Sequence, residues 1–232
     1  MVTSPLRLIL FDIDGTLVLG RGGLRGWFGE ALVEVFGASG DLDGYDFAGK
    51  IDPQIVTDLL AGAGVPTAQI EAGLPHVKAA YLNRLQTRLT ADHLELLPHV
   101  REVLERLQQR GEVTLGLLTG NWELGARTKL ACHDLNRFFR FGAFGDGQRH
   151  RSDLPPLALE RAAAVAGERF SVAQTLIVGD SPLDVECARL HGIRSAAVAT
   201  GRVPRAALEL AGADWVVSNL GEIHKIHPVF RY

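Results

Sequence analysis

Residues 6–16 of the chain read LRLILFDIDGT, an apolar run that leads directly into two aspartates. Such a run is typical of a strand that is buried on both faces of a sheet. Asp12 and Asp14 stand two residues apart, so in an extended chain their carboxylates project to the same side. Because Asp-Gly is also a common turn former, Asp14-Gly15 by itself is equally consistent with a plain turn.

Four further apolar runs along the chain are each followed by a helix-like stretch. The alternation of strand and helix patterns predicts an α/β fold with a Rossmann-like parallel sheet that is covered by helices. The further strand candidates are Val113–Leu118, Thr175–Val178, Ser195–Val198 and Asp214–Val217, and the helix candidates are Val100–Arg110, Leu157–Ala166, Leu183–Leu190 and Pro204–Leu210.

The interval between the first two apolar runs is long and contains helical patterns only. We interpret it as an inserted helical cap with helices at Leu24–Phe36, Gln54–Ala61 and Thr67–Leu89 and with no strand candidate. The glycine-rich entrance Gly20-Arg21-Gly22-Gly23 and the return Thr90–Pro98 are suited to act as hinges. The expected division is an α/β core of residues 1–17 and 93–232 and a helical cap domain of residues 18–92.

Composition and charge favour a small-molecule substrate. The 24 basic and 27 acidic residues give a formal charge of −3 and are spread along the chain, without the basic field that nucleic-acid binding needs. No apolar run approaches the roughly 20 residues of a membrane helix, and the first residues lack the cleavage site of a signal peptide. The two cysteines, Cys132 and Cys187, have no metal-ligand spacing and are read as free thiols. We therefore expect a cytoplasmic protein that binds neither nucleic acid nor membranes.

Ligands of open α/β sheets bind beyond the carboxyl ends of the strands, so the residues after each run are the candidates for chemistry. Thr119-Gly120-Asn121 follows the second run and can hold a phosphoryl group or cap a helix. Gly179–Asp184 follows a later run, with Asp180 at the strand end and Asp184 about one helical turn further on, where carboxylates also act as caps. Three such strand ends in one sheet favour a common phosphoryl-binding site over three separate caps.

These motifs resemble those of the haloacid dehalogenase-like hydrolase superfamily. The resemblance rests on Asp12-Ile13-Asp14-Gly15-Thr16, on Thr119 and on Gly179–Asp184, and it spans nearly the whole chain. The stretch Gly49-Lys50-Ile51-Asp52-Pro53-Gln54-Ile55 is similar to a cap segment of the phosphoglycolate phosphatase-like branch. The resemblance implies a phosphatase that hydrolyses a small phosphomonoester, phosphoglycolate or a similar metabolite.

The resemblance implies that the two aspartates of the first motif carry out the covalent chemistry. Asp12 would attack phosphorus to form an aspartyl-phosphate. Asp14 would protonate the leaving alcohol and then take a proton from the attacking water. An aspartate at position 14 also argues against dehalogenation, because a departing halide needs no proton.

The other matched residues are implied to hold a metal ion and the phosphoryl group. Mg²⁺ would be held by Asp12, the backbone carbonyl of Asp14 and Asp180, with Asp184 helping directly or through water. Thr119-Gly120-Asn121 would bind phosphoryl oxygens.

The chain departs from the superfamily pattern at the lysine that precedes the helix before the Gly179–Asp184 motif. The segment Gly145–Pro156 contains no lysine but has two arginines. We expect Arg151, just ahead of a proline-opened helix, to take the place of the lysine, with Arg149 as the alternative. Arginine keeps the charge and can grip phosphate through two donors, although two arginines in a loop are also common as plain surface residues. The four lysines of the chain are Lys50, Lys78, Lys129 and Lys225.

Two cations in glycine-flanked loops, Lys50 and Arg21, are candidates for binding a second anionic group of the substrate, although surface charge is the ordinary interpretation of Arg21. One alternative function is a phosphomutase, which would return the phosphoryl group from Asp12 to a bound sugar phosphate. Another is a non-catalytic regulator that binds a phosphorylated ligand, which the missing lysine supports and the intact aspartates oppose.

Overall fold

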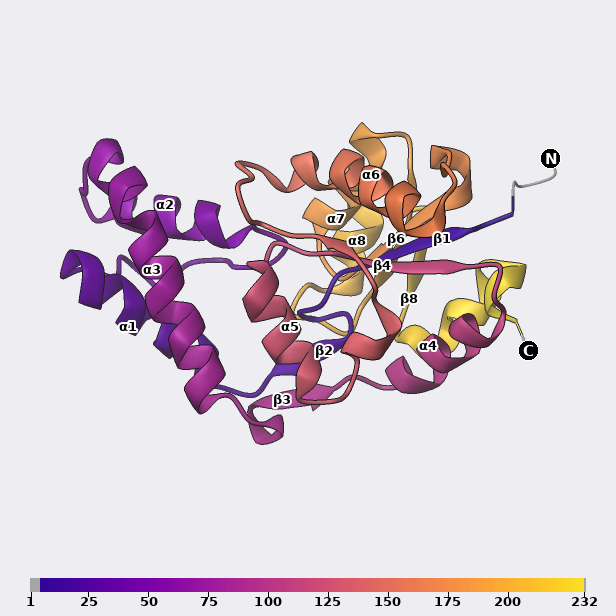
Figure 1. Cartoon of the computed structure of the whole chain (residues 1–232), viewed down its shortest axis with the longest axis horizontal. Helices are drawn as coiled ribbons and strands as arrows, with labels where there is room; N and C mark the ends of the chain where they lie inside the picture. The colour runs from indigo at the N-terminus through magenta and orange to yellow at the C-terminus, as the bar shows by residue number, and fades with distance from the viewer. Residues whose placement is uncertain (1–4, 232) are drawn as a thin grey trace.

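The computed structural model describes residues 5–231 and has a six-stranded parallel sheet at its centre, in the order β5-β4-β1-β6-β7-β8 (Figure 1). Each neighbouring pair is parallel, and β1 lies between β4 and β6, with Phe11 opposite Leu117 on one side and Val178 on the other. This arrangement confirms the α/β fold. The strands are β1 (Leu8–Phe11), β4 (Thr114–Leu118), β5 (Gly142–Ala143), β6 (Thr175–Gly179), β7 (Arg194–Val198) and β8 (Trp215–Val217).

The side chains of β1 alternate between the two faces of the sheet, as the period of a strand requires. Ile9 and Phe11 pack in one buried cluster and Leu8 and Leu10 in another, and none of the four is exposed. The first cluster is covered by α4 (Val100–Gln109) and α5 (Glu123–Ala131), and the second by α6 (Leu154–Ala166) and α7 (Pro182–Leu190). The last helix, α8 (Arg205–Leu210), packs Leu208 in a smaller cluster.

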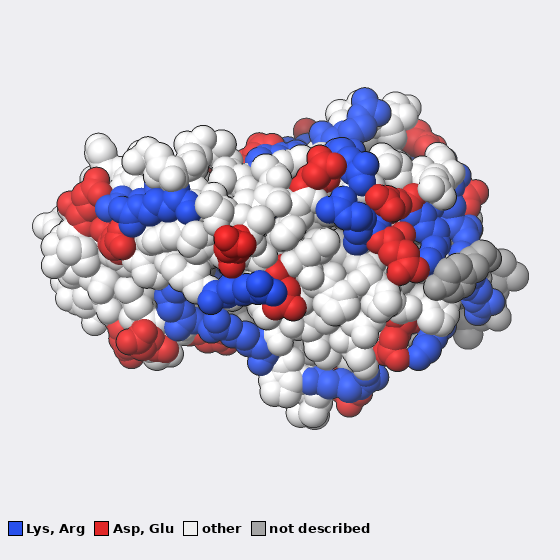
Figure 2. Space-filling model, turned by 90° about the horizontal axis from the view of Figure 1, so that it is seen from below, with Lys and Arg blue, Asp and Glu red and all other residues white. Residues whose placement is uncertain are grey.

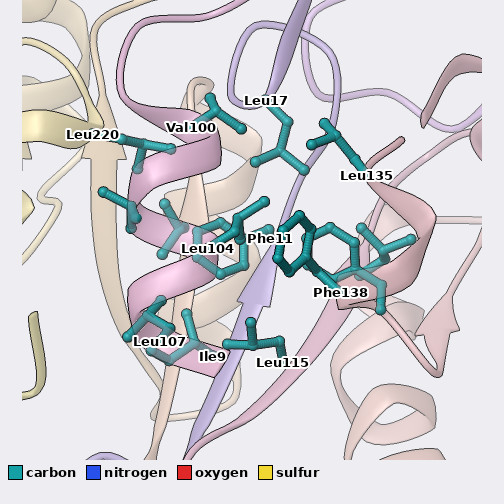
Figure 3. Close-up of a cluster of buried hydrophobic side chains, with 14 of the residues drawn as sticks. Ile9, Phe11, Leu17, Val100, Leu104, Leu107, Leu115, Leu135, Phe138 and Leu220 are labelled. Atoms are coloured by element: carbon teal, nitrogen blue, oxygen red, sulfur yellow. The ribbon is translucent and has the colours of Figure 1, made fainter. Parts of the chain in front are cut away.

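Helix α4 shows how sequence spacing produces this packing. Its buried residues Val100, Val103, Leu104 and Leu107 follow the i, i+3, i+4, i+7 pattern of an amphipathic helix. Figure 3 shows Leu104 and Leu107 facing the side chains of β1. Full burial of one such side chain stabilises the fold by about 1.5–3 kcal/mol, so this contact anchors the central strand that carries Asp12.

Three helices, α1 (Leu24–Phe36), α2 (Asp52–Gly62) and α3 (Thr67–Arg88), lie together at one end of the molecule (Figure 1). We call these helices and the loops between them the helical segment. They form a separate buried cluster that includes Phe28, Val56 and Tyr81. The side chain of Trp122, which precedes α5, is also part of this cluster and joins the helical segment to the sheet side of the molecule.

The expectation that no strand lies between the first two apolar runs was wrong. Strands β2 (Val18–Gly20) and β3 (Leu94–Leu96) pair antiparallel on either side of the helical segment. Each is three residues long, which is too short to produce a recognisable alternation. For the same reason the two-residue β5 had no predicted counterpart.

Charges of both signs are distributed over the surface. Figure 2 shows Lys and Arg side chains next to Asp and Glu side chains across one face. Some of these charges form ion pairs, as Arg84 does with Glu30 and Glu34. Within residues 5–231, no helix is long and apolar enough to cross a membrane.

Candidate active site

Residues from all three strand ends line one pocket of about 520 Å³ between the sheet and the helical segment. Asp12 directly follows β1, and its backbone N–H donates to the carbonyl of Val178 at 2.9 Å, which continues the β1–β6 pairing into the site. Only 4% of Asp12 is exposed. The lining residues include Asp12, Asp14, Thr119, Gly120, Asn121, Arg151 and Asp180 from the sheet side, and Phe28, Lys50 and Tyr81 from the helical segment.

Arg151 is the charged partner of Asp12. Its Nη2 lies 3.0 Å from Asp12 Oδ1, and both side chains are buried. Burial raises the pKa of Asp12 to about 7, with Arg151 lowering it and the carboxylates of Asp184 and Asp14 raising it further. The charge of Arg151 therefore has a strong electrostatic effect on Asp12, because water does not screen a pair that is buried.

The guanidinium of Arg151 makes several contacts at once. Arg151 begins a single-turn helix, Arg151–Asp153, just ahead of α6. Its Nη1 donates to the carbonyl of Gly49 in the helical segment at 2.9 Å, and its Nη2 also pairs with Asp184 Oδ1. Burial alone would lower the pKa of Arg151, but Asp184 and Asp12 outweigh burial and the pKa lies above its usual value. Arg151 is therefore a permanently charged link between the carboxylates and the helical segment.

Asp12, Asp180 and Asp184 form a buried acidic cluster, with one carboxylate oxygen from each within 4.8 Å of the others. Burial, followed by the charges of Asp12 and Asp184, raises the pKa of Asp180 well above its usual value. Within the described part of the chain, Asp180 accepts no side-chain hydrogen bond that would satisfy its charge. Gly15 has φ +84°, and a Cβ there would overlap the Asp180 carboxylate, so only glycine fits this approach. Carboxylate oxygens without protein donors are the ligands that a hard cation such as Mg²⁺ prefers.

Asp184 is held differently from Asp180. It is the third residue of a capping box at the start of α7, where its Oδ2 accepts from Ser181 N at 3.1 Å and from Ser181 Oγ at 2.6 Å. Its Oδ1 accepts from Arg151. Asp184 thus has the capping role that the sequence left open, while its carboxylate still lies beside Asp12 and Asp180.

A second network holds the carboxylate of Asp14. Asn121 Nδ2 donates to Asp14 Oδ2 at 2.7 Å and lies 2.8 Å from Thr119 Oγ1. Lys129 Nζ contacts Asp14 Oδ1 at 2.9 Å, Asp14 Oδ2 at 2.7 Å and Asn121 Oδ1 at 2.6 Å. The side chains of Asp14, Thr119 and Asn121, which follow two different strands, are therefore joined by hydrogen bonds.

Lys129 was missed by sequence reasoning, which considered a lysine only in the segment before α6 and expected a helix after Asn121 without giving its bounds or its buried face. A signal was present in the spacing. Gly125, Ala126, Lys129 and Leu130 are the buried residues of α5 and share one face of that helix. A lysine on the buried face of a helix needs a partner, and here the partner is Asp14.

The helical segment also contacts the start of α5. Asp52 Oδ2 accepts from the backbone N–H of Trp122 at 2.8 Å, and Asp146 Oδ2 accepts from that of Glu123 at 2.6 Å. Burial raises the pKa of Asp52 to about 7. Asp146 in turn pairs with Lys78 of α3. The helix that carries Lys129 is thus fixed at its first turn by groups from both parts of the molecule.

The remaining predicted binding residues divide into two groups. Lys50 lines the pocket, with its ammonium 3.9 Å from the centre of the Tyr45 ring and 3.4 Å from Asp58. Arg149 and Arg21 are exposed and do not line the pocket, and Arg21 lies 3.5 Å from Glu95. The structure therefore brings Lys50 and Arg151 to the site but not Arg149 or Arg21, whose loops direct them toward solvent and a surface partner.

Comparison with known proteins agrees with this geometry. The model of the haloacid dehalogenase-like hydrolase family matches residues 9–198. The chain is 32% identical over 200 residues to a phosphoglycolate phosphatase of Pseudomonas syringae pv. tomato, covering 84% of this chain and 70% of that protein. It is 30% identical over 223 residues to a phosphoglycolate phosphatase of Synechococcus elongatus, covering 94% of this chain and 95% of that protein.

The same likeness holds for the fold. The crystal structure of a predicted phosphatase from Clostridium acetobutylicum superposes with a TM-score of 0.73 and 20% identity, covering 96% of this chain and 98% of that one. The family match and the two sequence relatives confirm the resemblance drawn from the motifs and from the Gly49–Ile55 segment. The chain belongs to the haloacid dehalogenase-like hydrolase family.

Proposed function

We propose that this chain is a Mg²⁺-dependent phosphatase that hydrolyses a small phosphomonoester through an aspartyl-phosphate on Asp12. The observation that carries the proposal is the setting of Asp12, which is buried at the end of the central strand, paired with Arg151 through Oδ1, and open to the pocket. A carboxylate held in this way is suited to attack phosphorus in line with a leaving group on the pocket side.

In the first half of the reaction, an oxygen of Asp12 bonds to phosphorus while the bond from phosphorus to the alcohol oxygen breaks. Asp14 gives a proton to that departing oxygen. We assign Thr119, Gly120 and Asn121, which line the pocket, to the binding of the phosphoryl oxygens, and Arg151 balances the charge of Asp12.

In the second half, water attacks the aspartyl-phosphate and Asp14 takes the proton that the water loses. The bond between phosphorus and Asp12 breaks, which restores the Asp12 carboxylate and releases inorganic phosphate. One carboxyl group therefore gives a proton in the first half and receives one in the second.

The metal would be held by Asp12, the backbone carbonyl of Asp14 and Asp180. Bound there, Mg²⁺ would neutralise carboxylates that otherwise repel the substrate phosphate. Asp184 already accepts from Arg151 and from Ser181, which favours a contact through water over a direct one. Asp180, which lines the pocket and has no side-chain donor within residues 5–231, is the residue best prepared to bind the ion directly.

Phosphoglycolate or a similar small acid is the substrate class that the relatives' names support. Lys50 is the residue that we assign to a second anionic group, because it lines the pocket on the side of the helical segment. We further propose that residues 18–92 act as a cap over a core of residues 1–17 and 93–232. The free thiols of Cys132 and Cys187 are consistent with action in the reducing cytoplasm.

The missing lysine was the support for a non-catalytic regulator. Because Arg151 contacts Asp12, the site has a cation beside the nucleophile, and an enzyme is the function that fits the residues.

The test is phosphate release from a panel of phosphomonoesters that includes phosphoglycolate and sugar phosphates, with and without Mg²⁺. Asp12→Asn keeps the shape of the side chain but removes the nucleophile, so it should abolish release while the fold is retained by circular dichroism. Asp43→Asn, a change at an exposed aspartate, is the matched control and should be fully active. Activity near wild type in Asp12→Asn would rule out the covalent mechanism, and transfer to a sugar phosphate in place of release would indicate a phosphomutase.

A further inference from the structure

Lys129 lines the pocket and has no role in the reaction proposed above. Its Nζ lies 2.9 Å and 2.7 Å from the two oxygens of Asp14 and 2.6 Å from Asn121 Oδ1. It comes from α5, after the second strand end, whereas Arg151 comes from the segment before α6. The two cations therefore reach the site from different elements.

Arg151 and Lys129 each pair with different carboxylates of the site. Among the lysines and arginines of residues 5–231, only Arg151 and Lys129 are buried. Arg151 contacts Asp12 and Asp184, whereas Lys129 contacts Asp14. Burial works to lower the pKa of Lys129, but the charge of Asp14 leads the causes that raise it, and the pKa lies above its usual value. A buried ammonium without an anionic partner would be strongly unfavourable, so Lys129 needs the carboxylate of Asp14.

The contacts of Lys129 fix the direction of the Asp14 carboxylate. An ammonium only donates hydrogen bonds, so it holds Asp14 through the oxygens that must accept a proton. Asp14 is 43% exposed at its side chain and would be free to turn toward solvent without these contacts. Asn121 accepts from Lys129 through Oδ1 and donates through Nδ2 to Asp14, which closes a three-membered network and ties it to Thr119.

We propose that Lys129 is a positioning residue that holds the carboxylate of Asp14 toward the water that attacks the aspartyl-phosphate. The inference rests on the proposed function and adds to it a residue for the second half of the reaction. In that step the O–H bond of water breaks, its proton goes to Asp14, oxygen bonds to phosphorus, and the Asp12 carboxylate departs. Lys129 touches neither the water nor the phosphoryl group and acts through Asp14.

The proposal predicts that the two halves of the reaction respond differently to loss of Lys129. With p-nitrophenyl phosphate the leaving group needs no proton, so formation of the aspartyl-phosphate should be little changed in Lys129→Met. Hydrolysis of the intermediate should slow by about 100-fold, which is within the range for general acid–base catalysis. Stopped-flow absorbance should then show a burst of about one nitrophenolate per active site, followed by slow turnover. Lys129→Gln keeps an amide NH2 that can donate but has no charge, so its rate of hydrolysis of the intermediate should lie between those of Lys129→Met and wild type.

A double-mutant cycle separates positioning from a general structural effect. If Lys129 acts through Asp14, the slow phase of Asp14→Asn combined with Lys129→Met should be no slower than that of Asp14→Asn alone. Lys225→Met removes an exposed lysine that pairs with Glu222, and it is the matched control expected to behave as wild type.

Two results would overturn the proposal. One is a Lys129→Met enzyme with wild-type kinetics in both phases. The other is an equal loss in both phases that is additive with Asp14→Asn, which would give Lys129 a structural role. Failure of the proposed function is a separate result, since it would appear as phosphate release that survives Asp12→Asn, whatever Lys129→Met does.

Discussion

A guanidinium offers five N–H donors where an ammonium offers three, and Arg151 donates to groups on two sides of the pocket. Its Nη2 reaches Asp12 and Asp184, while its Nη1 reaches the carbonyl of Gly49 in the helical segment. A lysine at this position would supply the charge but could not span both sides of the pocket in the same way. The arginine thus combines charge balance at the nucleophile with a contact to the helical segment.

Replacement of Arg151 is predicted to separate these two roles. Arg151→Ala should lower kcat/KM by about 10²–10³-fold, comparable to the loss of a preorganised transition-state donor. Arg151→Lys should recover part of this loss because charge is retained while the contact with Gly49 is lost. The measurement is kcat/KM at saturating Mg²⁺, with circular dichroism to confirm folding. Arg149→Ala is the control from the same segment and should be silent, and a silent Arg151→Ala would refute the assignment.

Arg151 and Lys129 show what can be predicted at single positions. The resemblance to the superfamily implied a cation in the segment before α6, and Arg151 of that segment lies beside Asp12 in the structure. Lys129 was not found, because its role depends on a helix whose pattern is weak and on an approach of Asp14 that no local spacing encodes.

At the level of elements, length and apolar composition together decided what the sequence could predict. The three-residue β8 was predicted within Asp214–Val217 because its residues Trp-Val-Val are all apolar. The strands β1, β4, β6 and β7 are four or five residues long and fully or largely buried, so their apolar runs stand out. Strands β2, β3 and β5 have two or three residues and form only through hydrogen bonds to a neighbouring strand, β2 with β3 and β5 with β4. Helix α5 is short and contains Gly125 and Thr128, which are weak helix formers, and tertiary contacts at its first turn compensate for this.

The contact between the β4–α5 loop and the helical segment gives a prediction of its own. A Cβ on Gly120 would overlap the carbonyl oxygen of Lys50 and lie 2.8 Å from Ile51 Cα, which are backbone atoms that cannot move aside singly. Gly120→Ala should therefore push the Lys50–Ile51 backbone away from the sheet and lower kcat/KM by about 100-fold, as expected for a displacement of about 1 Å in a site. The measurement is steady-state kinetics with phosphoglycolate.

Gly62→Ala is the matched control for this change, because a Cβ on Gly62 in α2 meets no atom within 4 Å. It should leave kcat/KM unchanged and stabilise the helix by up to about 1 kcal/mol. Wild-type kinetics in Gly120→Ala would show that close approach of the two backbones is not needed for activity.

For the whole molecule, the site exists only where the carboxyl ends of the strands meet the helical segment (Figure 1). The sequence indicated the strand ends and predicted an inserted helical part, because each has its own local pattern. It did not predict which side chains of the two parts touch, such as Asp52 with Trp122 N or Arg151 with the Gly49 carbonyl, since these contacts join residues about 70 and 102 positions apart. The fold also brings the buried carboxylates of Asp12, Asp180 and Asp184 close together.

The acidic cluster of Asp12, Asp180 and Asp184 should make the stability of the whole molecule depend on Mg²⁺. Burial first, and then the charges of neighbouring carboxylates, raise the pKa values of Asp12 and Asp180, so their ionised forms are unfavourable in the folded state. An ion that binds only the folded state relieves this cost. At 100 times its Kd, Mg²⁺ should stabilise the fold by about 2.7 kcal/mol, or about 5–10 °C in Tm for a chain of this size. Asp180→Asn should lose this shift and, with chelator present, be at least as stable as wild type, because a neutral amide replaces the most crowded carboxylate. Differential scanning calorimetry with Mg²⁺, with chelator and with KCl at matched ionic strength measures each effect, and equal Mg²⁺ shifts in wild type and Asp180→Asn would place the ion elsewhere.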